Sequence, residues 1–376
     1  MMGAELEIVA ESGSARVGRL ITERGVVDTP AFMPVGTRGA VKTLSPGDLS
    51  DLGAQILLAN LYHLSLRPGV EVIEGLGGIH RFVGWQGPIL TDSGGYQIYS
   101  LSRLREVDED GVTFQNHLDG APMRLTPELV AERQQRLGVD IAMVLDECPP
   151  WPVEEETARA SLERTLVWAR RCREAWRDEG PGSLFGIVQG STFRPLREEA
   201  VERLTALELD GYAIGGVSVG EPDLERGSVV EWTAPRLPRD RPRYLMGVGY
   251  PGDILHAVRQ GVDLFDCVLP TRSARHGLLF TRGGELRIKH AEFREADEPP
   301  DPECSCPTCR QVSRAFLHHL CRYEPMTAHV LATRHNLAFY LDFLSEVRQA
   351  IETGTLPELE SRFVFDRRGE APAASP

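Results

Sequence analysis

The sequence predicts an α/β protein built on a (β/α)8 TIM barrel, with inserted hairpins and a C-terminal helical subdomain. Three observations support this prediction. Eight short apolar runs recur along the chain, as expected for parallel strands buried on both faces. Amphipathic helical patterns fill most of the gaps between the runs. Polar residues stand at the ends of the runs, where barrels of this kind carry their catalytic groups.

The apolar runs define eight predicted strands, which share continuous rather than alternating hydrophobicity. They span residues 31–35, 55–60, 88–92, 141–146, 184–189, 211–216, 243–247 and 263–269. Between them, Thr126-Pro127 is a helix start signal with proline at the first helical position. Residues 154–179 and 194–209 have long amphipathic patterns, which predict two further helices on the outside of the barrel.

Three segments do not fit the strand–helix repeat. Residues 4–22 predict an N-terminal hairpin with a Gly-Ser turn, and residues 102–123 predict a hairpin inserted after the third strand. Residues 270–289 predict another hairpin, which turns at Gly283-Gly284. We therefore expect a barrel domain over residues 1–290, a helical subdomain packed on it over 291–352, and a terminal segment with a frayed tail over 353–376.

Composition and charge restrict the class of protein. The chain has 376 residues, of which 41% are hydrophobic and 26% charged, so it is expected to be globular. No apolar run approaches the roughly 20 residues of a membrane span, and residues 1–10 have no basic signal region, so the expected location is the cytoplasm. In that reducing compartment the seven cysteines are expected to be thiols or metal ligands.

The charge is unevenly distributed. The net charge of −14 argues against non-specific nucleic-acid binding by the whole surface. Residues 270–290 nevertheless contain five basic residues and one acidic residue, Glu285; the basic ones are Arg272, Arg275, Arg282, Arg287 and Lys289. Such a local cluster suits one docked polyanion, although it is equally compatible with the solvated face of a hairpin.

The residues at the ends of the predicted strands suggest a chemistry. They are Asn60, Asp92, Asp146, Gln189, Gly215, Gly216, Gly247 and Asp266. Each alone is more often a cap or turn residue, but in a barrel all would meet at one mouth. Two carboxylates facing one substrate can perform retaining glycosyl transfer. A carboxylate, a glutamine amide and a bare glycine backbone can also read the donors and acceptor on the edge of guanine.

The C-terminal region contains a metal-binding pattern. Cys304, Cys306 and Cys309 form a C-x-C-x2-C cluster, and His335 follows 26 positions later. Three thiolates and one imidazole form a closed tetrahedral set, which is typical of structural zinc. His318, His319 and His329 are alternative fourth ligands. His318 and His319 are adjacent on an apparent helix, so they face different directions and are better explained as packing residues.

Three ordered motifs resemble the bacterial tRNA-guanine transglycosylase family. They are Thr91-Asp92-Ser93-Gly94-Gly95-Tyr96-Gln97, Phe265-Asp266-Cys267-Val268-Leu269-Pro270-Thr271-Arg272 and the Cys304/Cys306/Cys309/His335 set. The resemblance extends over about residues 34–336. It implies a barrel enzyme with one structural Zn(2+) per subunit. The implied reaction replaces the wobble guanine of tRNAs with a GUN anticodon by a 7-deazaguanine, in queuosine biosynthesis.

The resemblance also assigns roles to residues. It implies that Asp266 is the nucleophile on the ribose, which gives a covalent enzyme–tRNA intermediate, and that Asp92 is the acid/base. The residues that it implies for base binding are Ser93, Gly94, Gly95, Tyr96, Asp146, Cys148, Gln189, Gly216, Val217 and Met246, with Tyr96 and Met246 on either side of the ring. The residues that it implies for the anticodon loop are Gly247, Val248, Gly249, Tyr250, Pro251, Gly252, Asp253, Thr271, Arg272, Ser273, Ala274 and Arg275.

Two pocket residues bear on which base is accepted. Cys148 and Val219 resemble the bacterial type, which takes 7-aminomethyl-7-deazaguanine, whereas Val219 is expected to crowd the larger queuine. Val217-Ser218 departs from the Leu-Ala of many bacterial relatives at a backbone carbonyl expected to meet the aminomethyl group. Ala274 stands where some relatives have glycine.

The resemblance further implies a homodimer formed partly through the zinc region. Two other functions are compatible with parts of the sequence: a retaining glycoside hydrolase on the same barrel, and a non-catalytic tRNA-binding subunit. The cysteine cluster and the basic segment argue against the hydrolase, since a neutral sugar requires neither. Both Asp92 and Asp266 are present, which argues against the non-catalytic subunit.

Overall fold

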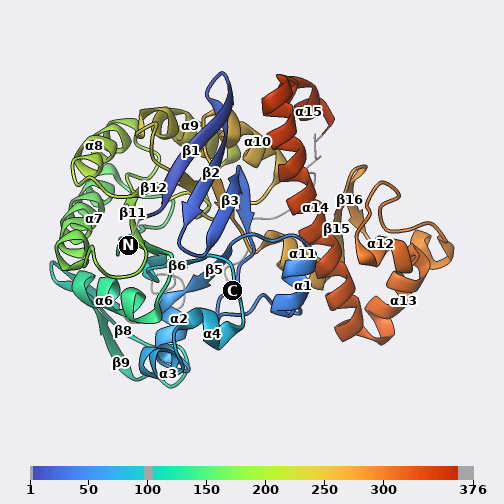
Figure 1. Ribbon diagram of the computed structural model, residues 1–376, viewed down its shortest axis with the longest axis horizontal. Coiled ribbons are helices and arrows are strands. Elements are labelled where there is room, and N and C mark those ends of the chain that lie inside the picture. The colour runs from blue at the N-terminus through green and yellow to red at the C-terminus, as the bar shows by residue number, and fades with distance from the viewer. Residues whose placement is uncertain (1–2, 97–104, 363–376) are drawn as a thin grey trace.

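A closed barrel of eight parallel strands forms the centre of the computed structural model, which describes residues 3–96 and 105–362. The strand order is β4-β14-β13-β12-β11-β10-β6-β5 (Figure 1). A parallel bridge between Val35 and Leu58 joins the ends of this order and closes the barrel. The strands are β4 (Ala31–Met33), β5 (Leu57–Asn60), β6 (Ile89–Asp92), β10 (Ile141–Met143), β11 (Ser183–Val188), β12 (Gly211–Ile214), β13 (Arg243–Leu245) and β14 (Leu264–Asp266).

All eight predicted barrel strands are confirmed, and most are shorter than the apolar runs that predicted them. The largest difference lies in the run 263–269. There the strand ends at Asp266, and helix α11 (Leu269–His276) begins three residues later, with Pro270 in its first turn. Proline is well accommodated there because the first helical N–H groups have no partner within the helix.

The outer layer contains the helices that separate the strands. In Figure 1 the helices α6, α7 and α8 surround one side of the barrel. The helices between barrel strands are α1 (Pro46–Asp51), α2 (Leu61–Leu66), α3 (Val70–Gly75), α4 (Ile79–Val83), α6 (Pro127–Leu137), α7 (Glu155–Ala175), α8 (Arg194–Thr205), α9 (Asp223–Thr233), the short η1 (Ala234–Arg236) and α10 (Pro251–Arg259). The predicted start at Thr126 is confirmed, since its side chain caps α6 by accepting from the Leu129 N–H.

A three-stranded antiparallel sheet covers the amino-terminal ends of the barrel strands. It contains the predicted hairpin, β1 (Glu5–Ser12) and β2 (Ala15–Thr22), and a third strand, β3 (Gly25–Thr29), that was not predicted. Arg16 on β2 donates to the Asp263 carboxylate, which lies just before β14. The sheet therefore leaves the opposite, carboxyl-terminal end of the barrel as the position for a site.

The insertion after β6 is also antiparallel. It consists of β7 (Arg105–Asp108), β8 (Gly111–Gln115) and β9 (Pro122–Leu125). The predicted hairpin is thus confirmed for its described residues, and β9 extends it. Residues 102–104 of the prediction, and Gln97 of the first motif, lie outside the described residues.

The segment predicted as a hairpin over 270–289 is half helix. Its first part forms α11, and its second part forms β15 (Leu278–Thr281) and β16 (Gly284–Arg287), which turn at the predicted glycines. The helices η2 (Ala291–Glu295), α12 (Pro307–Gln311), α13 (Arg314–Tyr323), α14 (Pro325–Thr353) and α15 (Leu356–Arg362) follow. The helical character of the cysteine-headed region is therefore confirmed.

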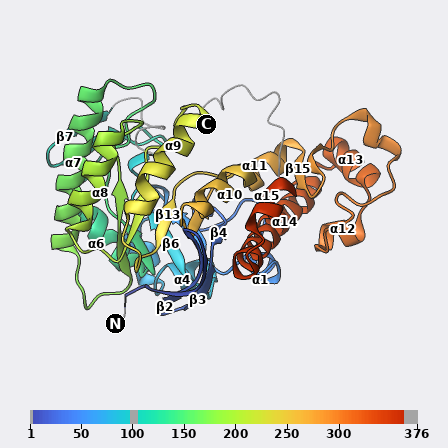
Figure 2. The same cartoon turned by 90° about the horizontal axis from the view of Figure 1, so that it is seen from above.

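Helix α14 joins this region to the barrel. In Figure 2 it lies between the barrel and the group formed by α12 and α13. Phe32 of β4 contacts Tyr340 of α14, with 4.9 Å between ring centroids, and Arg348 donates to the Pro30 carbonyl at 2.8 Å. Helix α14 therefore packs on the outside of the barrel beside β4. The domain division at 290/291 remains a prediction, and residues 363–376 of the predicted terminal segment lie outside the described residues. None of the helices in the described parts has the length and apolarity of a membrane span.

Candidate active site and metal centre

The carboxyl-terminal ends of the barrel strands bring the predicted polar residues together. Asp92 ends β6, Asp266 ends β14, and Asp146 and Gln189 follow β10 and β11. The two carboxylates Asp92 and Asp266 both act on Tyr244: burial and then Asp266 contribute most to raising the pKa of that phenol well above its usual value, and Asp92 adds to the effect. Both candidate catalytic groups therefore lie near one point of the mouth.

Asp266 is held by two hydrogen bonds to one of its oxygens. The Tyr244 hydroxyl donates to Oδ1 at 2.6 Å, and the Gly247 N–H donates to the same atom at 2.8 Å. Burial raises the pKa of Asp266, while these two donors oppose that rise. Since both bonds go to Oδ1, the carboxylate has a fixed orientation in which Oδ2 is not used by either donor.

Asp92 is oriented by its neighbouring strand. Asn60 ends β5 directly opposite Asp92, and its Nδ2 donates to Asp92 Oδ2 at 2.7 Å. The Asn60 Oδ1 accepts from the His63 N–H and so caps α2. One asparagine thus begins a helix and also fixes a candidate catalytic carboxylate.

Asp146 and Gln189 form a hydrogen-bonded pair at the same end of the barrel. Gln189 Nε2 donates to Asp146 Oδ2 at 2.7 Å, and Ser93 lies 3.5 Å from Asp146 Oδ1. Both residues are almost fully buried. Burial raises the pKa of Asp146 to about 6. The Gln189 Oε1 is buried and has no hydrogen-bond partner among the described residues, so it is available to a ligand.

Glycines allow the backbone after β6 to approach Asp146 and Tyr62 closely. A Cβ on Gly95 would lie 2.6 Å from Asp146 Oδ1, and a Cβ on Gly94 would lie 2.7 Å from Tyr62 Cβ. Gly94 also has a φ of 88°, which favours glycine. Substituting either residue would therefore displace the segment that leads from Asp92 to Tyr96.

Tyr96 and Met246 are candidates to enclose a planar ring. Tyr96 follows Gly95 and is 41% exposed, so its ring is accessible to a ligand. Met246 is half-buried, and a Cβ on Gly215 would lie 3.6 Å from its sulfur and 3.1 Å from Gln189 Nε2. Met246 and Gln189 therefore both lie close to Gly215.

Cys148, Val217 and Val219 also lie at this end of the barrel. Burial raises the pKa of the Cys148 thiol to about 12, so the thiol is neutral at physiological pH. Val217 is buried, whereas Val219 is half-buried. The Glu221 carboxylate accepts from the Ser218 and Val219 N–H groups at 2.5 and 2.9 Å, which fixes this loop.

The residues implied for the anticodon loop differ in accessibility. In the first segment Gly247 and Gly252 are exposed, Tyr250 and Asp253 are half-buried, and Val248, Gly249 and Pro251 are buried. In the second segment Arg272 and Arg275 are half-buried, and Thr271, Ser273 and Ala274 are buried. The buried members shape the surface, and the others can contact a partner directly.

The structure divides the basic cluster of the sequence. Arg282 pairs with Glu346, and Arg287 lies 3.9 Å from Glu285. Arg275 and the exposed Arg38 instead both lie near the exposed Lys42, because burial, then Arg275 and then Arg38 lower the pKa of Lys42. A positive surface therefore forms from α11 and the β4–α1 connection, two segments that are far apart in the sequence.

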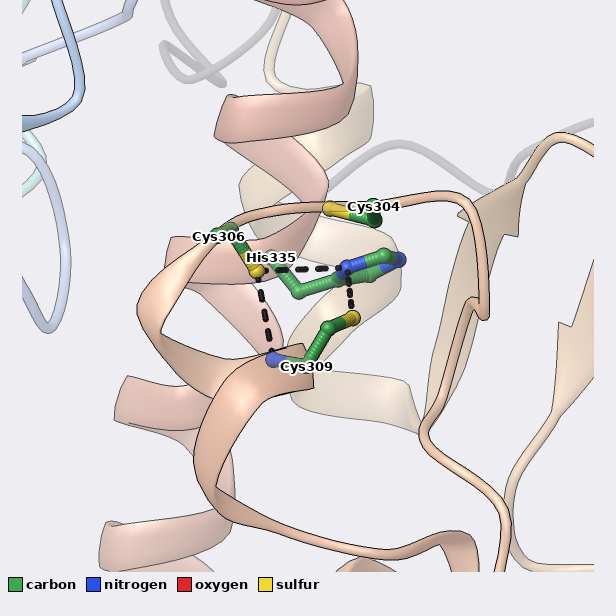
Figure 3. A group of neighbouring side chains, drawn as sticks. All are labelled: Cys304, Cys306, Cys309 and His335. Carbon is green, nitrogen blue, oxygen red and sulfur yellow. Dashed lines mark hydrogen bonds between the residues drawn. The ribbon is translucent and has the colours of Figure 1, made fainter.

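The four predicted metal ligands come together. One donor atom from each of Cys304, Cys306, Cys309 and His335 lies within 4.8 Å of the others (Figure 3). His335 Nδ1 lies 3.7 Å from the Cys306 sulfur and 3.2 Å from the Cys309 sulfur. A tetrahedral ion with zinc-like bond lengths would separate such atoms by roughly 3.6 Å. The group can therefore hold a metal ion.

The second nitrogen of the imidazole supports this arrangement. His335 Nε2 lies 2.9 Å from the Phe280 carbonyl oxygen, which can only accept, so the proton lies on Nε2 and Nδ1 faces the sulfurs. The alternative ligands have other contacts: His318 Nδ1 bonds to the Ile288 carbonyl at 2.8 Å, and His319 contacts the Tyr323 ring. His335 is thus the histidine of the cluster.

Helix α14 connects the metal cluster to the mouth. Asn336, next to His335, donates to the Pro270 and Leu278 carbonyls and accepts from the Phe280 N–H. One turn further on, the Tyr340 hydroxyl donates to the Gly249 carbonyl at 2.6 Å. The loops that follow β13 and β14 on either side of Asp266 are therefore both anchored to the helix that carries a metal ligand.

Sequence reasoning did not identify Tyr244 or Glu221 as members of the candidate site. Tyr244 had one available signal, since it lies two residues before Met246 and therefore on the same side of its strand. Glu221 bonds to backbone N–H groups of an irregular loop, for which the sequence carries no pattern.

Comparisons with known proteins agree on one family. The family model described as queuine tRNA-ribosyltransferase matches residues 11–368. A queuine tRNA-ribosyltransferase of Desulforudis audaxviator is 50% identical over 365 residues, which cover 96% of this chain and 98% of that protein. One from Aromatoleum aromaticum is 51% identical over 364 residues, with the same shares covered. One from Hydrogenovibrio crunogenus is 47% identical over 369 residues, covering 98% of this chain and 100% of that protein.

Proposed function

The chain belongs to the queuine tRNA-ribosyltransferase family, and we propose that it exchanges the wobble guanine of tRNAs with a GUN anticodon for 7-aminomethyl-7-deazaguanine, a step in queuosine biosynthesis. It is an enzyme of the tRNA-guanine transglycosylase class. The observation that carries the finer proposal is the pair Asp92 and Asp266 around Tyr244, beside a pocket that offers a carboxylate, a carboxamide and a glycine backbone.

The proposed reaction is a double displacement. An oxygen of Asp266 attacks C1′ of the wobble ribose, the bond from C1′ to N9 of guanine breaks, and guanine leaves with a proton supplied by Asp92. The incoming base then loses a proton to Asp92 and attacks C1′, which releases Asp266. No bond energy is lost to water, so no nucleotide cofactor is needed. The base must leave the stack to enter the pocket.

The contacts of Asp266 suit the role of nucleophile. Tyr244 and Gly247 both donate to Oδ1, so Oδ2 is the atom that we assign to the attack. Burial raises the pKa of the Asp266 carboxyl because it disfavours the charged form. Burial therefore also favours the neutral ester that the attack on C1′ forms over the ionised carboxylate. The same two donors stabilise the leaving carboxylate in the second displacement.

The base pocket has the chemistry of a guanine reader. The Asp146 carboxylate can accept from the N1–H and the 2-amino group, while the Gln189 amide and the Gly216 N–H can reach the acceptor atoms. Tyr96 and Met246 are proposed to enclose the ring. We propose that Cys148 and Val219 limit the size of the base, with Ser93, Gly94, Gly95 and Val217 shaping its surroundings.

Acidification should weaken base binding through Asp146. Its folded-state pKa is raised to about 6, so below that pH the carboxyl is protonated and one acceptor for the guanine donors is lost. We expect the KM for guanine to rise about tenfold per pH unit below the pKa of Asp146 and to be flat above it. Steady-state exchange kinetics between pH 5 and pH 8 measure this.

Asp146→Asn is the matched variant for this prediction. It should bind guanine about 10- to 100-fold more weakly at pH 8, and its KM should no longer rise on acidification. A profile with the same acid limb in Asp146→Asn would show that another group controls base binding.

The positive surface supports a polyanionic partner. Arg272 and Arg275 lie on α11, immediately after the strand that ends in Asp266, and Arg275 and Arg38 both lie near Lys42. We propose that these residues, together with the loop 247–253, hold the anticodon loop. Unpaired loop bases are the usual targets of sequence-specific RNA recognition.

Replacing Arg275 by Ala should weaken tRNA binding about tenfold at low salt, with no change in the KM for guanine. The slope of log affinity against log salt should fall by about 0.7, the value for one lost phosphate contact to single-stranded RNA. Arg287→Ala is the matched control, because Arg287 belongs to the same basic stretch of sequence but lies on the separate hairpin beside Glu285. Equal effects of the two variants on the salt slope would contradict the proposed surface.

We propose zinc as the metal of the Cys3His cluster, on the basis of its donor set and spacing. A homodimer formed partly through this region is also proposed; exposed apolar side chains on α13 and α14, such as Phe316 and Met326, are compatible with it. Mass measurement in solution tests the dimer. The cytoplasmic location remains a prediction.

The direct test of the function is incorporation of labelled guanine into unmodified tRNA of the queuosine-accepting type. The proposal predicts label at the wobble position, competition by 7-aminomethyl-7-deazaguanine, and weaker competition by queuine. Release of guanine without incorporation would indicate a hydrolase. Binding of tRNA with neither reaction would indicate a non-catalytic subunit.

A further inference from the structure

Arg197 is a buried arginine whose hydrogen bonds converge on backbone carbonyls. It is the fourth residue of α8 and is fully buried. Its Nε donates to Ser191 O at 2.7 Å, and Nη1 donates to Val188 O at 2.9 Å and to Gly215 O at 2.7 Å. Its Nη2 donates to Gly216 O at 3.2 Å. A guanidinium in this position is costly to bury, so its bonds call for a specific explanation.

One accepting carbonyl belongs to Val188, the last residue of β11, and the others belong to two turns that follow the adjacent strands β11 and β12. One turn follows β11 and carries Gln189, Gly190 and Ser191; the other follows β12 and carries Gly215 and Gly216. Three of these residues have positive φ angles: 129° at Gly190, 49° at Ser191 and 64° at Gly216. Such conformations persist when surrounding contacts hold them. The Arg197 side chain links both turns through its hydrogen bonds.

The bond to Gly215 has a consequence for the next residue. The Gly215 carbonyl and the Gly216 N–H belong to the same peptide unit, which is planar and trans, so they point in opposite directions. The guanidinium on the carbonyl side therefore directs the Gly216 N–H away from α8. No hydrogen bond from that N–H to another described residue is found. A charged donor on the carbonyl also polarises the peptide and strengthens its N–H as a donor.

The Gln189 side chain lies directly against this peptide. A Cβ on Gly216 would clash with Gln189 Oε1 and would lie 3.2 Å from Arg197 Nη2. Gln189 in turn donates to Asp146. The guanidinium, the Gly215–Gly216 peptide, Gln189 and Asp146 therefore form one contiguous group, in which the Gly216 N–H is a donor available to an acceptor atom of a bound base.

We propose that Arg197 is a positioning residue for base recognition: it fixes and polarises the Gly215–Gly216 peptide so that the Gly216 N–H donates to the carbonyl oxygen of the bound purine. This inference rests on the proposed function, because it takes a guanine-type base as the ligand. Burial lowers the pKa of Arg197 to about 10, so the guanidinium remains charged at neutral pH.

The test compares bases that differ at one edge atom. In 6-thioguanine a poorly accepting sulfur replaces the carbonyl oxygen, and the N1–H and 2-amino donors are kept; hypoxanthine keeps the oxygen and lacks the 2-amino group. In the wild-type enzyme, competition against labelled guanine should show about a tenfold or greater preference for guanine over 6-thioguanine. In Arg197→Met this preference should fall below about threefold, while the preference for guanine over hypoxanthine, which reports on Asp146, should persist.

Two further variants make the result decisive. Arg197→Lys retains the charge with fewer donors and should restore part of the preference for oxygen; it also replaces Arg197→Met if that variant does not fold. Arg194→Ala removes an exposed arginine of the same helix, paired with Glu198, and should leave both preferences unchanged.

An unchanged preference for guanine over 6-thioguanine in folded Arg197 variants would overturn the proposal. Equal weakening of all three bases would also overturn it, because it would indicate general support of the fold. These outcomes leave the proposed function intact, since exchange of guanine by the wild-type enzyme is measured in the same assay. Absence of that exchange would instead refute the proposed function.

Discussion

Replacing Asp266 by Asn should lower the rate of guanine exchange at least about 10⁴-fold, while tRNA affinity changes less than about threefold. An amide has almost the same shape as the carboxylate but is a far weaker nucleophile. The Tyr244 and Gly247 donors can still bond to the amide oxygen, so the loop after β13 should keep its position. Single-turnover exchange and a tRNA-binding titration measure the two quantities separately.

Two variants serve as controls for this prediction. Asp51→Asn changes an exposed carboxylate at the end of α1 and should leave exchange unchanged. Asp92→Asn should also slow exchange. The loss of rate should depend on how readily the base gains or loses a proton, since Asp92 is assigned to acid/base chemistry. Exchange by Asp266→Asn within tenfold of the wild type would contradict the assignment of the nucleophile.

Replacing Cys309 by Ser should abolish stoichiometric metal binding and destabilise the C-terminal region. The cluster is closed, and the binding free energy of such structural sites is of order 10 kcal/mol, most of it coupled to folding. Asn336 and Tyr340 lie on the same helix as His335, so disorder there should reach the loops at Pro270 and Gly249. We expect a loss of metal by elemental analysis, a lower Tm, and a fall in kcat of about tenfold or more.

Cys321→Ser is the matched control, because Cys321 lies on α13 outside the cluster. It should retain one metal ion and the wild-type Tm to within about 2 °C. Metal stoichiometry that is unchanged in Cys309→Ser, or lost equally in Cys321→Ser, would contradict the assigned ligands.

The barrel could be predicted because its strands are buried on both faces. Runs such as 184–189 therefore show continuous apolar sequence, and each is separated from the next by a helical pattern. The limits of the runs were less predictable, since residues beyond Asp266 remain apolar although the chain turns into α11. The third strand of the N-terminal sheet, β3, has mixed polarity, and its pairing with β2 depends on tertiary contacts.

The candidate site was predictable where a strand end or a short spacing marks it. Asp92, Asp146 and Asp266 follow strands, and the three cysteines lie within six residues, so these groups were found from the sequence. The residues that contact and orient these groups could not be predicted from the sequence. Tyr244 acts on Asp266 from the neighbouring strand, and Arg197 acts through carbonyl groups that every residue possesses. The positive surface also joins Arg275 to Lys42 across more than half of the chain.

The most direct test of the proposed covalent mechanism is the intact mass of the enzyme after incubation with unmodified tRNA and denaturation. The mechanism predicts a species with the mass of enzyme plus tRNA minus one guanine. This species should be absent with Asp266→Asn and should be discharged by added 7-aminomethyl-7-deazaguanine. Peptide mapping should locate the ribose on Asp266. Exchange without any such species, or with the ribose on another residue, would contradict the covalent mechanism.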